Sequence, residues 1–230
     1  MPKGSMRVEL FLEGLEMIEL PEPIREVLER IVEGEFLLVE YNTLSNIDLL
    51  PFKLTSIGKS VFVEIGDRLH VKLHALLRAH SDLAEAIKRT PIISVSNFYL
   101  SVPGFNIVNV PLNEISMIIS KFYSFMKDKN ERELLIICGM EQIALHFDVM
   151  SFMKELAGLK VALPSVTFIG FLNYNAIDTK TLATFESMAT SVVRIEGEVD
   201  KEGKRIRRYI YALKSINPVK YEVLELNHEI

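Results

Sequence analysis

Short apolar runs and amphipathic stretches alternate along most of the chain. The apolar runs are of strand length, and their successive apolar positions predict strands buried on both faces. We expect such strands at residues 35–41, 60–65, 91–95, 107–110, 134–138 and 166–172. Between them, apolar residues three and four positions apart predict helices. We expect these helices at residues 23–32, from about 49, at 67–79, 112–126 and 142–157, and around 182–188.

The pattern changes after residue 190. Three strand patterns follow one another without a helix, at residues 191–196, 205–213 and 221–226. Asp200 and Gly203 indicate a turn between the first two, which is typical of an antiparallel pair. The alternation before residue 190 instead predicts a parallel sheet.

These patterns predict the fold class and the domain organisation. We expect an α/β protein with a largely parallel sheet, helices on both faces and an antiparallel C-terminal extension. No repeat or flexible linker divides the chain, so residues 1–230 are expected to form one domain. Its α/β core would cover residues 20–190 and its extension residues 191–230.

Composition narrows the function classes. Of the 230 residues, 49% are hydrophobic, and the net charge of −5 does not favour a general nucleic-acid binder. Cys138 is the single cysteine, which excludes a disulfide within the chain and a cysteine-cluster zinc site. No apolar run reaches about 18 residues, and the first residues lack the apolar stretch of a signal peptide. We therefore expect a cytoplasmic protein with no membrane contact.

The carboxyl ends of the predicted parallel strands are where ligands bind in open α/β sheets. Polar and aromatic residues follow several of these strands, notably Asn97 and Tyr99 after the third, and Asn173 after the sixth. Together with Tyr41 and Asn42 they would form a hydrogen-bonding surface with little charge, suited to a peptide or protein partner. Ordinary packing of loops remains the simpler interpretation.

Several segments together resemble the RecA/KaiC-like ATPase core, especially the small KaiC-like proteins of archaea. These segments are residues 34–41, 61–64, 133–138, 194–196 and 208–214. The first is similar to the strand that leads into the phosphate loop. The second is similar to the strand that carries the catalytic glutamate of active members, here Glu64. The last two resemble a C-terminal hairpin that ends in a basic residue, here Lys214. The resemblance covers about residues 24–214 and implies a RecA-like sheet.

The chain departs from this family where ATP chemistry needs specific residues. A phosphate loop reads G-x-x-x-x-G-K-[ST], because glycines let backbone N–H groups wrap the phosphates and the lysine neutralises charge. Residues 42–48 read NTLSNID, without glycine or lysine, and Asp48 would repel phosphate. The Walker B strand should end in a Mg²⁺-binding aspartate, but Cys138 and Gly139 stand there. The sequence thus predicts a degenerate member that is not an ATPase.

Three other motifs have weaker functional interpretations. Residues 58–60 read GKS, but they precede a strand, whereas a phosphate loop follows one. His70 and His74 share a helix face without a third metal ligand nearby in the sequence. Cys138 suits a buried apolar role better than that of a nucleophile. Its candidate partners, His146 and Asp148, would point in different directions from one helix. We expect no catalytic residues, no metal and no cofactor.

A basic cluster surrounds the predicted C-terminal turn. Arg205, Arg207, Arg208 and, at the end of the strand, Lys214 are its candidate contact residues. A solvated hairpin is the first interpretation, contact with another subunit the second, and nucleic-acid contact the third, since the chain as a whole is acidic.

Our leading hypothesis is a non-catalytic RecA/KaiC-like binding module for a protein or peptide segment, with self-association as a further option. The expected cleft residues are Tyr41, Asn42, Thr43, Ser45, Glu64, Asn97, Tyr99 and Asn173. The first alternative is an atypical nucleotide-binding relative that uses Lys53 or Lys59. The second is a nucleic-acid-associated protein that uses residues 205–208.

Overall fold

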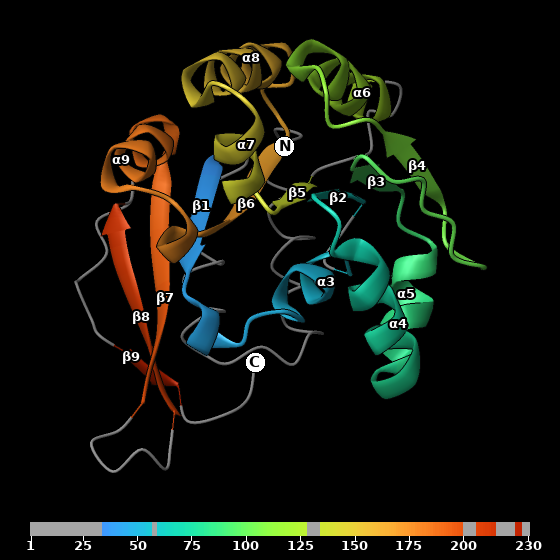
Figure 1. Cartoon of the computed structure of the whole chain (residues 1–230), viewed down its shortest axis with the longest axis horizontal. Coiled ribbons are helices and arrows are strands. Elements are labelled where there is room, and N and C mark those ends of the chain that lie inside the picture. Colours follow the sequence, from blue (N-terminus) through green and yellow to red (C-terminus); the bar gives the residue numbers. More distant parts are fainter. Residues whose placement is uncertain (1–33, 57–58, 128–133, 200–205, 215–223, 227–230) are drawn as a thin grey trace, which may run out of the picture.

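The computed structural model describes residues 34–56, 59–127, 134–199, 206–214 and 224–226. These residues form one nine-stranded sheet in the order β4-β3-β2-β5-β6-β1-β7-β8-β9 (Figure 1). The strands from β4 to β7 are parallel, and β8 is antiparallel to both of its neighbours. The strands are β1 (Phe36–Tyr41), β2 (Ser60–Ile65), β3 (Ile92–Val95), β4 (Ile107–Val110), β5 (Leu134–Cys138), β6 (Thr167–Asn173), β7 (Ser191–Val199), β8 (Ile206–Lys214) and β9 (Leu224–Leu226).

Helices cover both faces of the sheet. One face carries α3 (Leu50–Leu54), α4 (Leu69–Ala79) and α5 (Ser81–Lys88), and the other carries α6 (Ile115–Lys127), α7 (Glu141–His146), α8 (Val149–Ala162) and α9 (Thr179–Met188) (Figure 1). Two short 3₁₀ helices, η1 (Thr43–Ser45) and η2 (Tyr174–Ala176), follow β1 and β6. The predicted α/β class, with its largely parallel sheet and antiparallel C-terminal extension, is confirmed.

The strands divide the core into two halves, because successive side chains point to opposite faces. In β1, Leu37 and Val39 pack under α3 and α4, whereas Phe36 and Leu38 pack under the α6–α9 layer. The same alternation carries Tyr41 to the α3–α4 face. This places a tyrosine ring at the carboxyl end of β1, next to the helices that follow β1 and β2.

Two helix predictions need correction. The helix expected at 142–157 is two helices, because Phe147 is extended and Asp148 begins α8 by accepting a hydrogen bond from Ser151 N at 2.9 Å. His146 and Asp148 therefore do not share a helix. The α5 helix was not predicted, because its short apolar stripe follows α4 after one residue, His80. The expected helix 23–32 lies outside the described residues.

Boundaries elsewhere agree closely with the sequence patterns. The strands at 60–65, 107–110 and 134–138 begin and end where predicted. Of the strand expected at 221–226, the structure describes 224–226. No helix in the described part of the chain has both the length and the apolar character needed to cross a bilayer.

Candidate functional site

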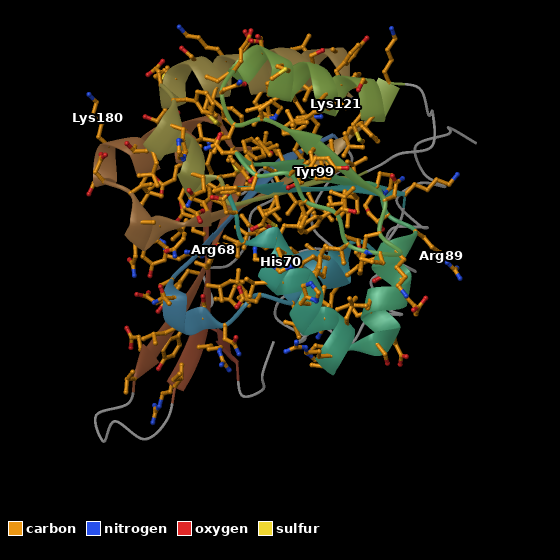
Figure 2. All side chains as sticks on the ribbon, turned by 45° about the vertical axis from the view of Figure 1, so that its right-hand side comes forward. Arg68, His70, Arg89, Tyr99, Lys121 and Lys180 are labelled. Carbon is orange, nitrogen blue, oxygen red and sulfur yellow. The ribbon has the colours of Figure 1, made fainter. Side chains whose placement is uncertain are left out.

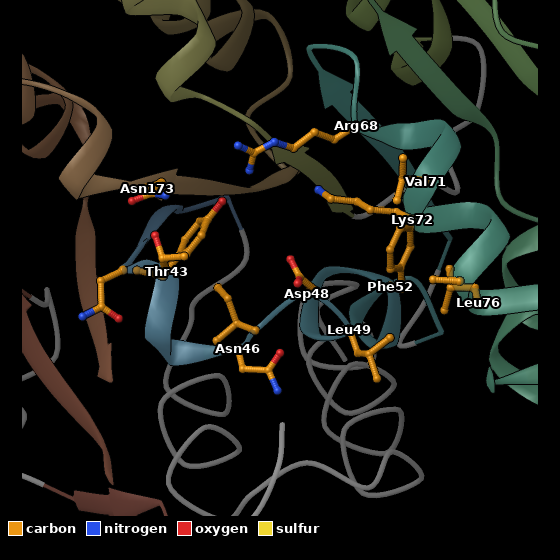
Figure 3. A pocket seen from close by; sticks show the side chains of 14 residues that line it. Thr43, Asn46, Asp48, Leu49, Phe52, Arg68, Val71, Lys72, Leu76 and Asn173 are labelled. Carbon is orange, nitrogen blue, oxygen red and sulfur yellow. The ribbon is translucent and has the colours of Figure 1, made fainter. Parts of the chain in front are cut away.

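A cavity of about 360 Å³ lies at the carboxyl ends of β1 and β6, and α4 forms its opposite wall (Figure 3). Its polar lining comes from Tyr41, Asn42, Thr43, Asn46, Asp48 and Asn173, and its cations are Arg68 and Lys72. Apolar side chains such as Phe52 and Leu76 complete the wall. The volume falls at the lower end of the range for small-ligand and peptide pockets.

Lys72 is held in the wall by a buried carboxylate. Its Nζ lies 2.7 Å and 2.9 Å from the two carboxylate oxygens of Glu64, whose side chain is 1% exposed. Burial lowers the pKa of Lys72, but Glu64 and the other negative groups around it together raise that pKa above its ordinary value. Burial raises the pKa of Glu64 against the opposing charge of Lys72. The pair contributes almost no net charge to the cavity.

The hydroxyl of Tyr41 remains a hydrogen-bond donor. Burial first, and then the carboxylates of Glu141 and Glu64, raise the pKa of Tyr41 above its ordinary value. These residues are close because their strands or following turns end at the same edge of the sheet. A phenol with a raised pKa keeps its proton at neutral pH and can donate a hydrogen bond to an acceptor.

The segment after β1 is hydrogen-bonded to β7. The Asn42 amide donates to Gly197 O at 2.8 Å and accepts from Gly197 N at 2.9 Å. A Cβ at position 197 would lie 2.3 Å from Leu44 O, so only glycine permits this close approach. Ser45 is buried and donates its hydroxyl to Asn42 O, so it lies outside the cavity lining. Asn42 and Ser45 thus hold the segment after β1 in position beside the cavity.

The structure brings together only part of the predicted cleft. Tyr41, Asn42, Thr43 and Asn173 line the cavity, and Glu64 lies behind Lys72. Asn97 and Tyr99 do not line it; both are exposed on the segment after β3, where Tyr99 is 84% exposed (Figure 2). The sequence interpretation placed all strand ends at one site, whereas β3 is separated from β1 by three strands.

Arg68 and Lys72 were missed in the sequence. Both belong to the start of the helix that follows β2, four residues apart, and so lie on one side of it. Figure 3 shows both cationic ends extending from α4 toward the side where Thr43 and Asn173 lie. The available signal in the sequence was this four-residue spacing soon after an apolar strand that has a glutamate, Glu64, as its penultimate residue.

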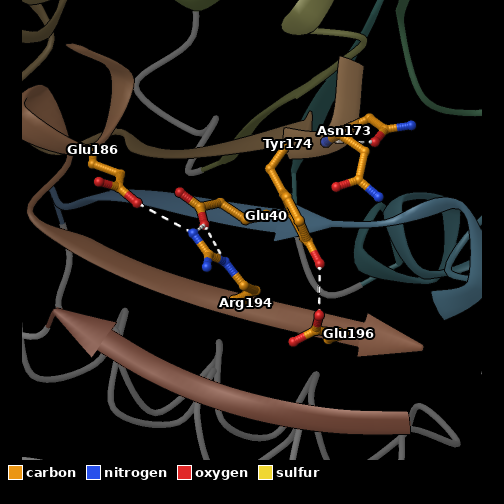
Figure 4. Close-up of polar contacts among 7 residues, drawn as sticks. Glu40, Asn173, Tyr174, Glu186, Arg194 and Glu196 are labelled. Atoms are coloured by element: carbon orange, nitrogen blue, oxygen red, sulfur yellow. Dashed lines mark hydrogen bonds and ion pairs between the residues drawn. The ribbon is translucent and has the colours of Figure 1, made fainter. Parts of the chain in front are cut away.

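A second polar cluster lies on the opposite face of β1 (Figure 4). Arg194 of β7 donates from Nε to Glu40 Oε2 at 2.8 Å, and one of its terminal nitrogens forms an ion pair with the same oxygen at 2.7 Å. That terminal nitrogen donates to Glu186 Oε1 at 3.4 Å. The guanidinium also stacks on the ring of Tyr174, whose hydroxyl donates to Glu196 at 3.2 Å. Glu40 is fully buried, and its Oε1 has no hydrogen-bond partner among the described residues.

Burial determines the protonation of Glu40. It raises the pKa of Glu40 to about 7, against the opposing hydrogen bonds and charge of Arg194. This carboxyl group therefore titrates near neutral pH, in contrast to an exposed glutamate.

The basic hairpin gives less support to a nucleic-acid site than its sequence suggests. Lys214 donates to the carbonyls of Ala189 at 2.6 Å and Glu186 at 3.2 Å, at the C-terminal end of α9. A cation there is favourable for the helix dipole. Arg208 is buried, Arg207 is exposed, and Arg205 lies outside the described residues.

Cys138 is buried at the end of β5, on the same face as Glu64. Burial and then the negative charge of Glu64 raise the pKa of its thiol well above the ordinary value, so it is not a thiolate nucleophile at neutral pH. His146 is exposed at the end of α7. His70 and His74 lie with ring centroids 4.4 Å apart, and no group of three metal-ligating residues occurs among the described residues.

No family model matches the sequence, and no curated protein matches it. Solved structures match the fold. A structural-project protein from Pyrococcus horikoshii OT3 aligns with a TM-score of 0.61 and 17% identity over 84% of this chain and 92% of that one. A KaiC-like protein from the same hyperthermophilic archaeon aligns with a TM-score of 0.61 and 16% identity over 85% of both chains. The flagellar accessory protein FlaH from Methanocaldococcus jannaschii aligns with a TM-score of 0.55 and 11% identity over 83% of both. The chain therefore has the KaiC-like, RecA-type fold expected from its sequence.

Proposed function

We propose that this protein is a non-catalytic binding module, which holds a segment of a partner protein in the cavity between β1, β6 and α4. The observation that carries the proposal is the mixed lining of that cavity. Amide and hydroxyl groups from Asn46, Thr43 and Asn173 line it together with apolar side chains that a ligand can reach, such as the exposed Val71 and the half-buried Leu49. Peptides bind in pockets of this composition, because main-chain amides need hydrogen bonds and side chains need apolar contact.

The charges around the cavity do not favour a nucleoside triphosphate. Two cations line it, and Lys72 is already neutralised by Glu64. Asp48 lines the same cavity, and Glu141 is close enough to raise the pKa of Tyr41. A triphosphate with about four negative charges would meet one uncompensated cation and several carboxylates.

The backbone after β1 also lacks what a phosphate needs. Phosphate loops present successive N–H groups followed by the first turn of a long helix. Here α3 has five residues, and Pro51, in its first turn, has no N–H. The lysines of the nucleotide-binding alternative, Lys53 and Lys59, do not line the cavity. We therefore favour the peptide over the nucleotide.

Calorimetry with ATP and Mg²⁺ tests the nucleotide alternative. We expect no heat of binding at several temperatures. A dissociation constant below about 100 μM, or about −5.5 kcal/mol, that disappears in Lys72→Met but not in Lys53→Met would contradict our proposal and establish nucleotide binding at this cavity.

Site-specific photo-crosslinking in cells of the source tests the proposal directly. A photoreactive residue at Val71, which lines the cavity and is 68% exposed, is expected to capture a defined protein adduct. The matched control is Val161 on α8, on the other face of the sheet and 82% exposed, which should capture no such adduct. Ala75→Trp, which fills the cavity, should abolish the adduct, whereas Ala79→Trp on the same helix should not. Equal adducts from positions 71 and 161 would refute the proposal.

A further inference from the structure

The α9 helix has a weaker apolar anchor than its neighbour α8. Of the α9 side chains, Phe185 is buried, and Leu182 and Met188 are half-buried against the core. α8 buries four side chains on the same face of the sheet. A helix that buries less apolar surface opens more easily, so the polar contacts of α9 contribute more to holding it in place.

Two cations from the C-terminal hairpin of β7 and β8 supply these polar contacts. Lys214 of β8 donates to the backbone carbonyls of Glu186 and Ala189 at 3.2 Å and 2.6 Å. Arg194 of β7 donates from a terminal nitrogen to the carboxylate of Glu186 at 3.4 Å (Figure 4). The first contact uses carbonyls, whose charge does not change with pH, whereas the second joins α9 to a cation that is shared with another carboxyl group.

Arg194 divides its donors between Glu186 and Glu40. The terminal nitrogen that reaches Glu186 also lies 2.7 Å from Glu40 Oε2, and Nε donates to that same oxygen at 2.8 Å. Charge-assisted hydrogen bonds have lengths of roughly 2.7–2.9 Å, so the guanidinium is at full bonding distance from Glu40 but not from Glu186. Glu40 is fully buried, and its Oε1 has no hydrogen-bond partner among the described residues.

The other groups around this cluster do not compete for the proton. Leu38 of β1 and Leu172 of β6 are apolar core residues on the same face. The ring of Tyr174, from η2, stacks on the guanidinium of Arg194. Burial and then the charge of Glu196 raise the pKa of Tyr174 to about 12, so its hydroxyl stays neutral and donates to Glu196 at 3.2 Å.

Glu40 is the group of the cluster whose charge changes near neutral pH. Burial, opposed by Arg194, raises its pKa to about 7, and the negative charge of Glu186 contributes to this rise. The two carboxyl groups therefore repel one another when both are ionised. Ionised Glu40 acts on α9 in two ways, because it competes for Arg194 and repels Glu186.

We propose that Glu40 and Arg194 form a proton-sensitive latch for α9. When Glu40 is neutral, the charge of Arg194 is available to Glu186 and holds α9 against β7. When Glu40 is ionised, it draws the guanidinium to itself and repels Glu186, so α9 is held less firmly. Both effects loosen α9 as pH rises from about 6 to 8. The latch lies on the face of β1 opposite the cavity and does not depend on the cavity's ligand.

Spin labelling of the full chain tests this proposal, because the line shape of a nitroxide reports local mobility in the folded protein. One label is attached through Ala183→Cys, at an exposed position of α9. The matched control label uses Gly158→Cys, at an exposed position of α8 with nothing within 4 Å. Cys138 is buried, and wild-type protein treated with the same reagent checks that it stays unlabelled. We expect the mobile fraction at position 183 to rise about fivefold between pH 6 and pH 8, and that at position 158 to stay constant.

Variants of the protein labelled at position 183 identify the groups that form the latch. Glu40→Gln keeps a neutral side chain and should leave the mobile fraction at pH 8 as low as at pH 6. Glu186→Gln removes the carboxylate that Arg194 holds and should give the larger mobile fraction already at pH 6. Glu198→Gln, at an exposed position of β7, is the control and should follow the wild-type protein.

Several outcomes would overturn the latch. A mobile fraction at position 183 that is independent of pH would do so, and so would equal changes at positions 183 and 158, which indicate a general loosening. A pH response that persists in Glu40→Gln would assign the titration to another group. A normal response in Glu186→Gln would show that Arg194 does not hold α9 through this carboxylate. Glu186 is 33% exposed, so its variant is expected to fold and decides the matter even if Glu40→Gln does not fold.

Discussion

Glu40 should make the stability of this protein depend on pH near neutrality. Its pKa rises from 4.5 to about 7, because burial disfavours the charged form more than Arg194 favours it. The folded state therefore binds a proton more tightly than the unfolded state does, and stability falls as pH rises through this window. A change of this size corresponds to about 3 kcal/mol of unfolding free energy lost between pH 4.5 and pH 8.

Glu40→Gln removes this titration while it keeps the shape of the side chain. We expect urea denaturation of the wild-type protein to show the loss of about 2.5 kcal/mol relative to the variant as pH rises from 5 to 8. Glu198→Gln, at an exposed position of β7, is the control and should follow the wild-type curve. Parallel curves for wild type and Glu40→Gln across this range would refute the assignment of a raised pKa to the buried carboxyl group.

Three further predictions concern the site, each measured by urea denaturation at pH 7. Asn42→Ala should lower the unfolding free energy by about 2–4 kcal/mol, because both backbone groups of Gly197 lose their partners. Gly197→Ala should cost about 1–3 kcal/mol through overpacking, whereas Gly158→Ala, in open space on α8, should gain up to about 1 kcal/mol. Equal changes in unfolding free energy for Gly197→Ala and Gly158→Ala would contradict the close approach of Leu44 O to Gly197. Lys72→Met should cost about 3–5 kcal/mol, because it leaves Glu64 buried alone, and Glu64→Gln in that background should recover part of it.

The strands were predictable because their residues are apolar on both faces. Residues 60–65 and 134–138 carry apolar side chains to both helix layers. A run this short and this apolar is typical of a strand in the middle of a parallel sheet. The break between α7 and α8 was not predicted, because Phe147 continues the apolar stripe of a single helix. There, the Asp148 cap and the extended Phe147 backbone outweigh the periodicity of the side chains.

The site was harder to predict than the fold. Strand alternation places Tyr41 and Asn173 at one edge on the α3–α4 face, and the sequence interpretation found both. It also included Tyr99, because the sequence shows which residues follow strands but not the order of the strands in the sheet. Arg68 and Lys72 depend on the rotation of α4 about its axis, which packing of Leu69, Leu73 and Leu76 against the sheet determines.

The turn after β1 has a structural role of its own, and this role affects which groups line the cavity. Asn42 bonds both backbone groups of Gly197, and Leu44 O approaches Gly197 too closely for any side chain. The turn therefore joins β1 to β7 and closes one side of the cavity. A glycine-rich loop placed at 42–48 could turn its backbone N–H groups toward a phosphate. It would lose the Asn42 contacts, and the carboxylates of Glu64 and Glu141 would remain nearby. For this reason the lining of the cavity includes groups from outside the loop, among them Arg68, Tyr41 and apolar side chains of α3 and α4.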